Sequence, residues 1–342
     1  MKYIYIIIIY FFPLSVIAQQ GGLNAFSFVN IVHSPRIDAL GGSGIAIYDD
    51  DVSLITITPS LLNSTMNNQL LFTFGDYFSD INLLSSTYIL NLKKIGVFGF
   101  TIQTINYGNF ERNDASGYNQ GAFSAHDQVM TFGIGKRINS KFSIGANLKL
   151  LNSIYDVYNA FALSSNISTT YFNEEKNFTS TLLIKNIGRQ VNYYSSIKET
   201  FPLEAQFAIS KELAHLPFRY HLSYNDIMNF NIKSPYKLLM QTNIETGALE
   251  LKDESFAKTI LRHIIIGGEL NPFRKSLFVR GGFNFQRRFD LTITNKPAMI
   301  GFSWGVGFRV YKYYFDYSRS AFHLSGIINN FSISTNLSSF GI

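Results

Sequence analysis

The sequence predicts an all-β transmembrane protein, an antiparallel β-barrel of about 14 strands preceded by an N-terminal plug segment. Hydrophobic residues make up 46% of the 342 residues and charged residues only 15%, against about 25% in typical soluble domains. Beyond the N-terminus, no run approaches the roughly 18 apolar residues of a spanning helix. From about residue 70 onwards, short segments alternate apolar and polar residues. A closed barrel is the other structure that satisfies every backbone group inside a bilayer.

The first 18 residues are typical of a secretory signal peptide. Lys2 supplies a positive start, residues 3–17 form an apolar run containing Pro13, and Ala18 offers a small residue for cleavage. A short N-terminal membrane anchor is the alternative interpretation. With a barrel pattern downstream, the signal predicts a multi-pass protein of the cell outer membrane.

Composition also bounds the chemistry. The chain has no cysteine, which excludes thiolate catalysis and cysteine-ligated metals. The formal net charge is +6, but lysine and arginine are spread thinly between the strands, so a nucleic-acid partner is not expected. Outer-membrane lipids and anionic lipopolysaccharide are the predicted partners of this charge. No motif for a cofactor appears.

The clearest predicted strand covers residues 141–150. Its apolar face carries Phe142, Ile144, Ala146, Leu148 and Leu150, opposite Lys141, Ser143, Gly145, Asn147 and Lys149. Large apolar side chains on one face and small or polar ones on the other are what a lipid-facing strand requires. The two lysines predict a polar interior.

Thirteen further segments bring the count to about 14. They are residues 70–75, 81–92, 97–103, 129–135, 160–171, 178–187, 203–210, 218–224, 238–246, 260–270, 276–286, 302–311 and 327–337. Longer polar stretches at residues 106–125, 186–200 and 224–237 are predicted to be rim loops, and the short turns to lie at the periplasmic end. The predicted division is a signal peptide at 1–18, a plug segment at 19–65 and a barrel at 66–342.

Residues 35–62 differ from everything after them. They contain Gly41 and Gly42, the adjacent acids Asp49, Asp50 and Asp51, and a break at Pro59. Glycine- and aspartate-rich chain without a period of two indicates turn and loop. The three acids could offer oxygen ligands to Ca²⁺, but they lack the alternate spacing of a calcium loop. A solvated turn, or partners for basic residues in a barrel lumen, is the favoured interpretation, and no metal site is predicted.

Two other features could carry function. His221 with Ser223, and His323 with Ser325, each place a histidine and a serine on one strand face, as in outer-membrane phospholipase. Ordinary polar positions explain both pairs, so no catalytic residue is predicted and the chain is not expected to be an enzyme. The stretch at residues 106–120 carries Tyr107, Phe110 and Tyr118. These aromatic residues suit contacts with a partner or glycan, and a disordered surface loop is the alternative.

The block from Arg36 to Gly42, followed by Ala46 and the aspartates, resembles the N-terminal signature of FadL-like barrels of the type IX secretion system. That family includes PorV and PorQ, and the similarity to the PorQ group extends over nearly the whole mature chain. The signature positions in the plug are Asp38, Gly41, Gly42, Asp49, Asp50, Asp51 and Pro59. One departure is Thr58, where the family pattern has asparagine.

The resemblance implies a non-enzymatic outer-membrane protein of Bacteroidetes-type bacteria. It would anchor a PorZ-like surface protein in an attachment complex with PorU and PorV, which fixes cargo to lipopolysaccharide. It also implies a FadL-like barrel whose N-terminal segment enters the lumen. The alternative function is a FadL-like transporter of hydrophobic small molecules, which the barrel alone would suggest.

Overall fold

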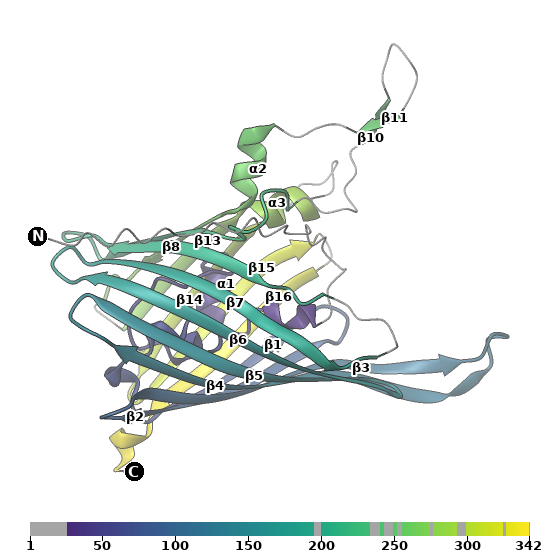
Figure 1. The fold of residues 1–342 in the computed structure, drawn as a ribbon, viewed down its shortest axis with the longest axis horizontal. Coiled ribbons are helices and arrows are strands. Elements are labelled where there is room, and N and C mark those ends of the chain that lie inside the picture. The colour runs from purple at the N-terminus through teal and green to yellow at the C-terminus, as the bar shows by residue number, and fades with distance from the viewer. Residues whose placement is uncertain are drawn as a thin grey trace, which may run out of the picture.

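A closed antiparallel barrel dominates the computed structural model of the chain (Figure 1). The structure describes residues 26–341 except 195–199, 233–239, 243–248, 252–254, 274–275, 293–298 and 324–325. The barrel strands are β1 (Gln69–Asp76), β2 (Asn82–Leu92), β3 (Gly96–Asn113), β4 (Asn119–Arg137), β5 (Phe142–Tyr155), β6 (Tyr158–Asn173), β7 (Phe178–Asn192), β8 (Glu204–Glu212), β9 (Phe218–Tyr224), β12 (Ile264–Leu270), β13 (Leu277–Asn284), β14 (Phe302–Val310), β15 (Tyr313–His323) and β16 (Gly326–Asn336). Each strand pairs with its neighbour along the chain, and β1 closes the barrel on β16.

The remaining elements lie before the barrel, in its connections or after it. Before β1 come η1 (Ser27–Asn30), α1 (Pro35–Ala39), η2 (Val52–Thr56), η3 (Pro59–Leu61) and η4 (Ser64–Met66). The connection from β9 to β12 contains a small sheet of β10 (Met240–Thr242) and β11 (Leu249–Leu251), then α2 (Phe256–Arg262). Helix α3 (Phe285–Leu291) follows β13, and η5 (Leu337–Phe340) follows β16. Among the described residues, no helix has the length and apolar character needed to cross a membrane.

Strand β5 shows how the sequence pattern produces the two surfaces of the barrel. Ile144 and Leu148 are half exposed, at 50% and 48%, whereas Asn147 and Lys149 on the opposite face are buried. The same outward placement of large apolar side chains recurs around the wall, at Phe72, Leu84, Ile102, Phe207 and Trp304. A water-facing surface would not carry so continuous an apolar band. The predicted barrel, its count of 14 strands and its outer-membrane location are therefore confirmed.

The two ends of the barrel differ. Short connections, such as Leu92 to Gly96 and Val310 to Tyr313, share an end with the start of β1 and the end of β16. The long connections with α2 and α3 lie at the other end (Figure 1). Outer-membrane barrels keep their short turns in the periplasm, so we call these the periplasmic and outer ends.

The strand count was right, but one predicted strand lies outside the barrel and one barrel strand was missed. Of the segment 238–246, predicted as a barrel strand, the structure describes Met240–Thr242, which form β10 and pair with β11 outside the barrel. The missed strand is β15, residues 313–323. Its outward face carries Arg319 as well as aromatic residues, and its inward face begins with Tyr314. Aromatic residues on both faces, and a charge on the outer one, hide the alternation that marks the other strands.

Two predicted segments change structure at one end. The candidate at 276–286 is a strand only to Asn284, whose side chain accepts a hydrogen bond from the Arg287 amide and caps α3. The candidate at 260–270 begins as helix α2 and becomes β12 at Ile264. Both helices lie at the outer end, where the chain leaves the bilayer and a helix can replace the sheet.

The predicted rim loop at 106–125 is wrong as a loop, because most of it continues β3 and β4. Pairing extends to Asn113 and Asn119, with bulges on the way. Strand β2 pairs with β3 only as far as Asn106, and β5 pairs with β4 only from Ala125. The outer parts of β3 and β4 thus form a two-stranded ribbon that projects beyond the barrel (Figure 1).

Candidate functional site

The N-terminal segment, residues 26–66, lies inside the barrel (Figure 1). Its apolar side chains are buried in clusters that include strand residues: Ile37, Leu54 and Leu61 pack with Phe172, and Ile45 and Ala46 pack with Leu183 and Ala208. Short helical turns connected by loops leave many backbone groups without partners of their own. Polar side chains on the inner face of the barrel supply some of the missing hydrogen-bond partners.

Helix α1 shows this dependence. Ser34 caps its start by accepting a hydrogen bond from the Ile37 amide, and Pro35 occupies the first turn, where no backbone donor is needed. Beyond its end, the side chain of Asn284 donates to the Gly41 carbonyl at 3.2 Å. Ser303 likewise donates to the Ala39 carbonyl at 3.1 Å. The barrel wall thus supplies hydrogen-bond donors to the carbonyl groups at the end of the helix.

Glycines in the N-terminal segment and in the barrel wall allow the two backbones to approach each other closely. Gly41 and Gly42 have φ of 91° and 92°, which an L side chain rarely adopts. A β-carbon at Gly42 would meet Arg287, and one at Gly282 in β13 would lie 2.2 Å from the backbone of Gly41 and of Leu40. The glycine pair that stood out in the sequence is therefore required by the turn and by its contact with the wall.

A second contact lies on β5. A β-carbon at Gly145 would lie 2.3 Å from the Pro59 carbonyl carbon, so the turn at η3 rests directly on the strand backbone. Ser60 binds β6 on the same side: its amide donates to Ser168 Oγ at 2.9 Å, and its hydroxyl shares a 2.7 Å hydrogen bond with Thr170. Pro59 thus starts a turn that three inward-facing positions hold.

Six charged side chains join the segment to the wall near the periplasmic end. We call Arg36, Asp49, Arg219, Glu269, Arg280 and Asp316 the charged network. Arg36 donates to Asp49 at 2.8 and 2.5 Å and to Glu269 at 3.0 and 2.9 Å. Arg219 reaches Asp49 at 2.8 Å, and Arg280 reaches Glu269 at 2.6 Å and also pairs with Asp316.

The charged network is balanced, with three arginines and three acids. Burial disfavours the ionised carboxyl of Asp49, but Arg36 and Arg219 outweigh it and hold the pKa of Asp49 well below its ordinary value. The pKa of Arg36 is raised although burial alone would lower it, because Asp49 and Glu269 favour the charged form. Charge-assisted, bidentate contacts of this kind are the strong ones, and they fix the segment in one position.

Asp38 makes a separate contact from α1 to β15 and β16. Its carboxylate accepts hydrogen bonds from Ser318 at 2.9 Å and Asn330 at 3.1 Å, with Arg287 at 3.9 Å. Burial raises the pKa of Asp38, an effect that Arg287 and these hydrogen bonds partly offset. Because this buried carboxylate is hydrogen-bonded to side chains of both strands, it holds α1 in position against the wall.

The aspartate run is thereby explained in part. Asp49 and Asp51 face Arg36, the latter at 3.6 Å, while Asp50 is exposed and lies 3.9 Å from Arg309. The interpretation of these acids as partners for basic residues in the lumen is confirmed for Asp49 and Asp51. The basic partners on the wall, Arg219 and Arg280, and their acid Glu269 were not singled out in the sequence. The sequence signal that could have identified them is a charged residue at an inward-facing position of an otherwise regular strand.

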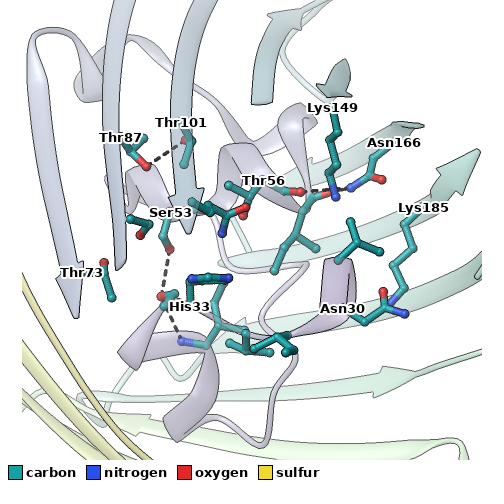
Figure 2. A pocket seen from close by; sticks show the side chains of 18 of the residues that line it. Asn30, His33, Ser53, Thr56, Thr73, Thr87, Thr101, Lys149, Asn166 and Lys185 are labelled. Atoms are coloured by element: carbon teal, nitrogen blue, oxygen red, sulfur yellow. Dashed lines mark hydrogen bonds between the residues drawn. The ribbon is translucent and has the colours of Figure 1, made fainter. Parts of the chain in front are cut away.

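Two cavities flank the segment. A cavity of about 770 Å³ opens at the periplasmic end. It is lined by the charged network except Glu269, together with Arg309, Lys312 and Tyr314. A second one, of about 60 Å³, lies deeper between the segment and the inner faces of β3, β5, β6 and β7 (Figure 2). Nearer the outer end, Phe26 and Phe28 pack with Leu83, Ile105 and Phe201 in an apolar cluster.

The three aromatic residues predicted to face a partner have different surroundings. Tyr107 turns inward, where its hydroxyl donates to Asp127 at 2.5 Å and its ring contacts Tyr155. Phe110 lies on the projecting ribbon and stacks on Phe123, with ring centroids 5.3 Å apart. Tyr118 at the tip of the ribbon is 73% exposed. Phe110 and Tyr118 are accessible to a partner, whereas Tyr107 is engaged in the lumen.

Of the two histidine–serine pairs, the structure describes the side chains of the first. His221 and Ser223 share the inward face of β9 and are buried, but neither ring nitrogen of His221 nor the Ser223 hydroxyl has a hydrogen-bond partner. The pair therefore lacks the hydrogen bond that activates a serine. Of the second pair, Ser325 and the side chain of His323 lie outside the described residues.

No family model matches the chain. No curated protein matches it in sequence either. Solved structures do share its fold. The CymD monoaromatic hydrocarbon channel is 10% identical, with 88% of this chain and 97% of that chain covered and a TM-score of 0.50. The deltaS2S3 mutant of the TodX monoaromatic hydrocarbon channel is also 10% identical, with 89% of this chain and 99% of that chain covered and a TM-score of 0.50. A FadL homologue of Pseudomonas aeruginosa is 10% identical, with 88% of this chain and 98% of that chain covered and a TM-score of 0.49.

These likenesses define the class of the fold. The chain is an outer-membrane β-barrel whose fold resembles those of the CymD and TodX channels over nearly its whole length. At 10% identity, the likeness establishes the architecture and leaves the function to be argued from the lumen.

Proposed function

We propose that the chain is an outer-membrane channel for small hydrophobic molecules, with the N-terminal segment closing the lumen. The observation that carries the proposal is the shared barrel: the CymD structure, described as a monoaromatic hydrocarbon channel, covers 88% of this chain. The apolar cluster around Phe26 and Phe201 gives a hydrophobic molecule a favourable environment near the outer end. The open cavity on the other side of the segment gives it an exit.

Passage in this scheme requires the segment to move. Its contacts are unequal along its length: charged near the periplasmic end, apolar near the outer end. An apolar guest can compete with the packing of Phe26 and Phe28 but not with charged hydrogen bonds. The outer part of the segment is therefore the part expected to yield to substrate.

Uptake of radiolabelled toluene tests the channel. Cells of a host without FadL-type channels that express this chain are expected to accumulate toluene several-fold faster than cells with an empty vector, because the barrel bypasses the outer-membrane barrier. Uptake of glucose, measured in parallel, should be unchanged, since a closed lumen admits no polar solute. Equal toluene rates in both strains would eliminate the channel function.

A second candidate function is an anchor for a surface protein. The N-terminal segment resembles the signature of type IX secretion barrels, and the β3–β4 ribbon presents Phe110 and Tyr118 outside the membrane. A ribbon with unpaired edges and exposed aromatic side chains suits a protein partner. In this scheme a PorZ-like protein binds the ribbon, with PorU and PorV in the same complex and lipopolysaccharide as the acceptor surface.

Affinity purification from outer membranes tests the anchor. The unaltered chain is expected to retain a surface protein that the double variant Phe110→Ala, Tyr118→Ala loses, because the ribbon would lose its accessible aromatic area. Tyr107→Phe is the matched control, since it changes an inward residue of the same strand and should retain the partner. Identical co-purifying proteins from all three chains would count against an interface on the ribbon.

A further inference from the structure

The small cavity between the N-terminal segment and the wall has an unusual lining. Its lining combines apolar side chains, such as Val29, Ile37 and Ile45, with hydroxyl and amide side chains. Three basic residues also contribute to it: His33 from the segment, Lys149 from β5 and Lys185 from β7. No acidic residue belongs to this lining among the residues that the structure describes. Figure 2 shows both lysines reaching from the barrel strands toward the segment.

The two lysines differ in how their charge is balanced. Lys185 forms an ion pair with Glu204 at 2.8 Å. Lys149 is only 4% exposed, and no ion pair or hydrogen bond to its ammonium is found within the described part of the chain. Burial disfavours the charged form of an ammonium group that has no counter-ion. An anion beside Lys149 would offset that cost.

His33 cannot supply a negative charge, but it can help to hold an anion. Burial and the nearby Lys149 lower the pKa of His33 to about 4, so its ring is neutral at neutral pH. Its Nδ1 atom is buried and has no hydrogen-bond partner, and in one tautomer this nitrogen is a donor. Gln103 and Thr101 from β3 line the same cavity and add further donors.

We propose that the small cavity binds a compact monovalent anion, of the size of chloride or formate, between Lys149 of the wall and His33 of the segment. The volume of about 60 Å³ is several times the roughly 10–15 Å³ needed for one water, so the cavity has room for a small anion such as chloride or formate. The anion touches both parts of the molecule, so its binding stabilises the docked segment. This inference is independent of the proposed channel function.

Chloride NMR on the purified full-length protein in detergent tests the site. Gluconate, which is much larger than chloride, serves as the background anion to occupy exposed basic groups. The ³⁵Cl line is expected to broaden saturably with the unaltered protein and to sharpen when formate is added. Lys149→Met should abolish this excess broadening, whereas Lys141→Met, at an exposed position just before β5, should leave it intact.

Thermal stability gives a second readout. At a fixed heating rate, the unaltered protein should lose its β-sheet signal roughly 2–4 °C higher in saturating chloride than in gluconate, and Lys149→Met should show no such shift. Should Lys149→Met not fold, Lys149→Gln takes its place, with folding checked by migration in detergent gels. Absence of saturable broadening in the unaltered protein overturns the proposal, as does full broadening in a folded Lys149 variant.

Discussion

Replacing Arg36 with methionine is expected to release the N-terminal segment from the barrel wall. The change leaves Asp49 and Glu269 without their shared bidentate partner and gives the charged network an excess negative charge. Removing one member of a buried ion pair costs about 3–5 kcal/mol. The segment should become accessible to protease, and purified protein in planar bilayers should conduct ions more readily than the unaltered chain.

Two further variants make this expectation specific. Arg309→Met removes an arginine from the same cavity, but its side chain is 49% exposed and its nearest acid, Asp50, is itself exposed at 3.9 Å. Exposed pairs contribute about 0–1 kcal/mol, so this variant should behave like the unaltered chain. Arg36→Met combined with Glu269→Gln restores the charge balance and should recover part of the protection. If Arg36→Met and Arg309→Met were equally protected and equally closed, the charged network would not hold the segment.

Adjacent glycines of β13 are expected to respond in opposite ways to valine. At Gly282, the new β-carbon would lie 2.2 Å from the backbone around Gly41. That backbone cannot retreat, because Asn284 and Ser303 hold it by hydrogen bonds. Overpacking costs about 1–3 kcal/mol where neighbours can adjust, and more is expected here. Gly282→Val should lower the unfolding temperature and expose the segment to protease.

Gly281→Val is the matched control. A β-carbon at Gly281 meets nothing within 4 Å, because this residue lies on the outward face of the same strand. Valine is a good strand former and apolar, so the variant should fold and resist protease like the unaltered chain. Comparison of apparent unfolding temperatures and protease digests decides the outcome. Equal behaviour of the two variants would contradict the docking of the segment against β13.

Periodicity was the reliable part of the sequence. In β5, the face carrying Ile144 and Leu148 is the outer one and the face carrying Asn147 and Lys149 is the inner one, as predicted. This alternation can be read from the local sequence, because the polarity of each residue indicates which face of the wall its side chain occupies. It weakens where both faces carry aromatic residues, which is why β15 was missed. It also cannot tell a barrel strand from a short ribbon, which is why residues 238–246 were included.

The candidate site was predicted only in part. The run from Asp38 to Asp51 and the turn at Pro59 stood out because they break the strand pattern, and the structure puts them against the wall. Their partners did not stand out. Glu269 lies 233 residues from Arg36, and each inward charge on a strand is unremarkable until the barrel closes.

The sequence alone therefore determined that the chain forms a membrane barrel, which side chains face lipid, and which segment differs from the strands. These properties depend on composition and on neighbouring residues. Only the tertiary structure decided how Arg36, Asp49, Arg219 and Glu269 meet, and that Lys149 lies in the lumen without an acidic partner among the described residues. Closure of the barrel brings strands that are distant in sequence around one segment. Contacts between such distant residues produce no periodic pattern in the sequence.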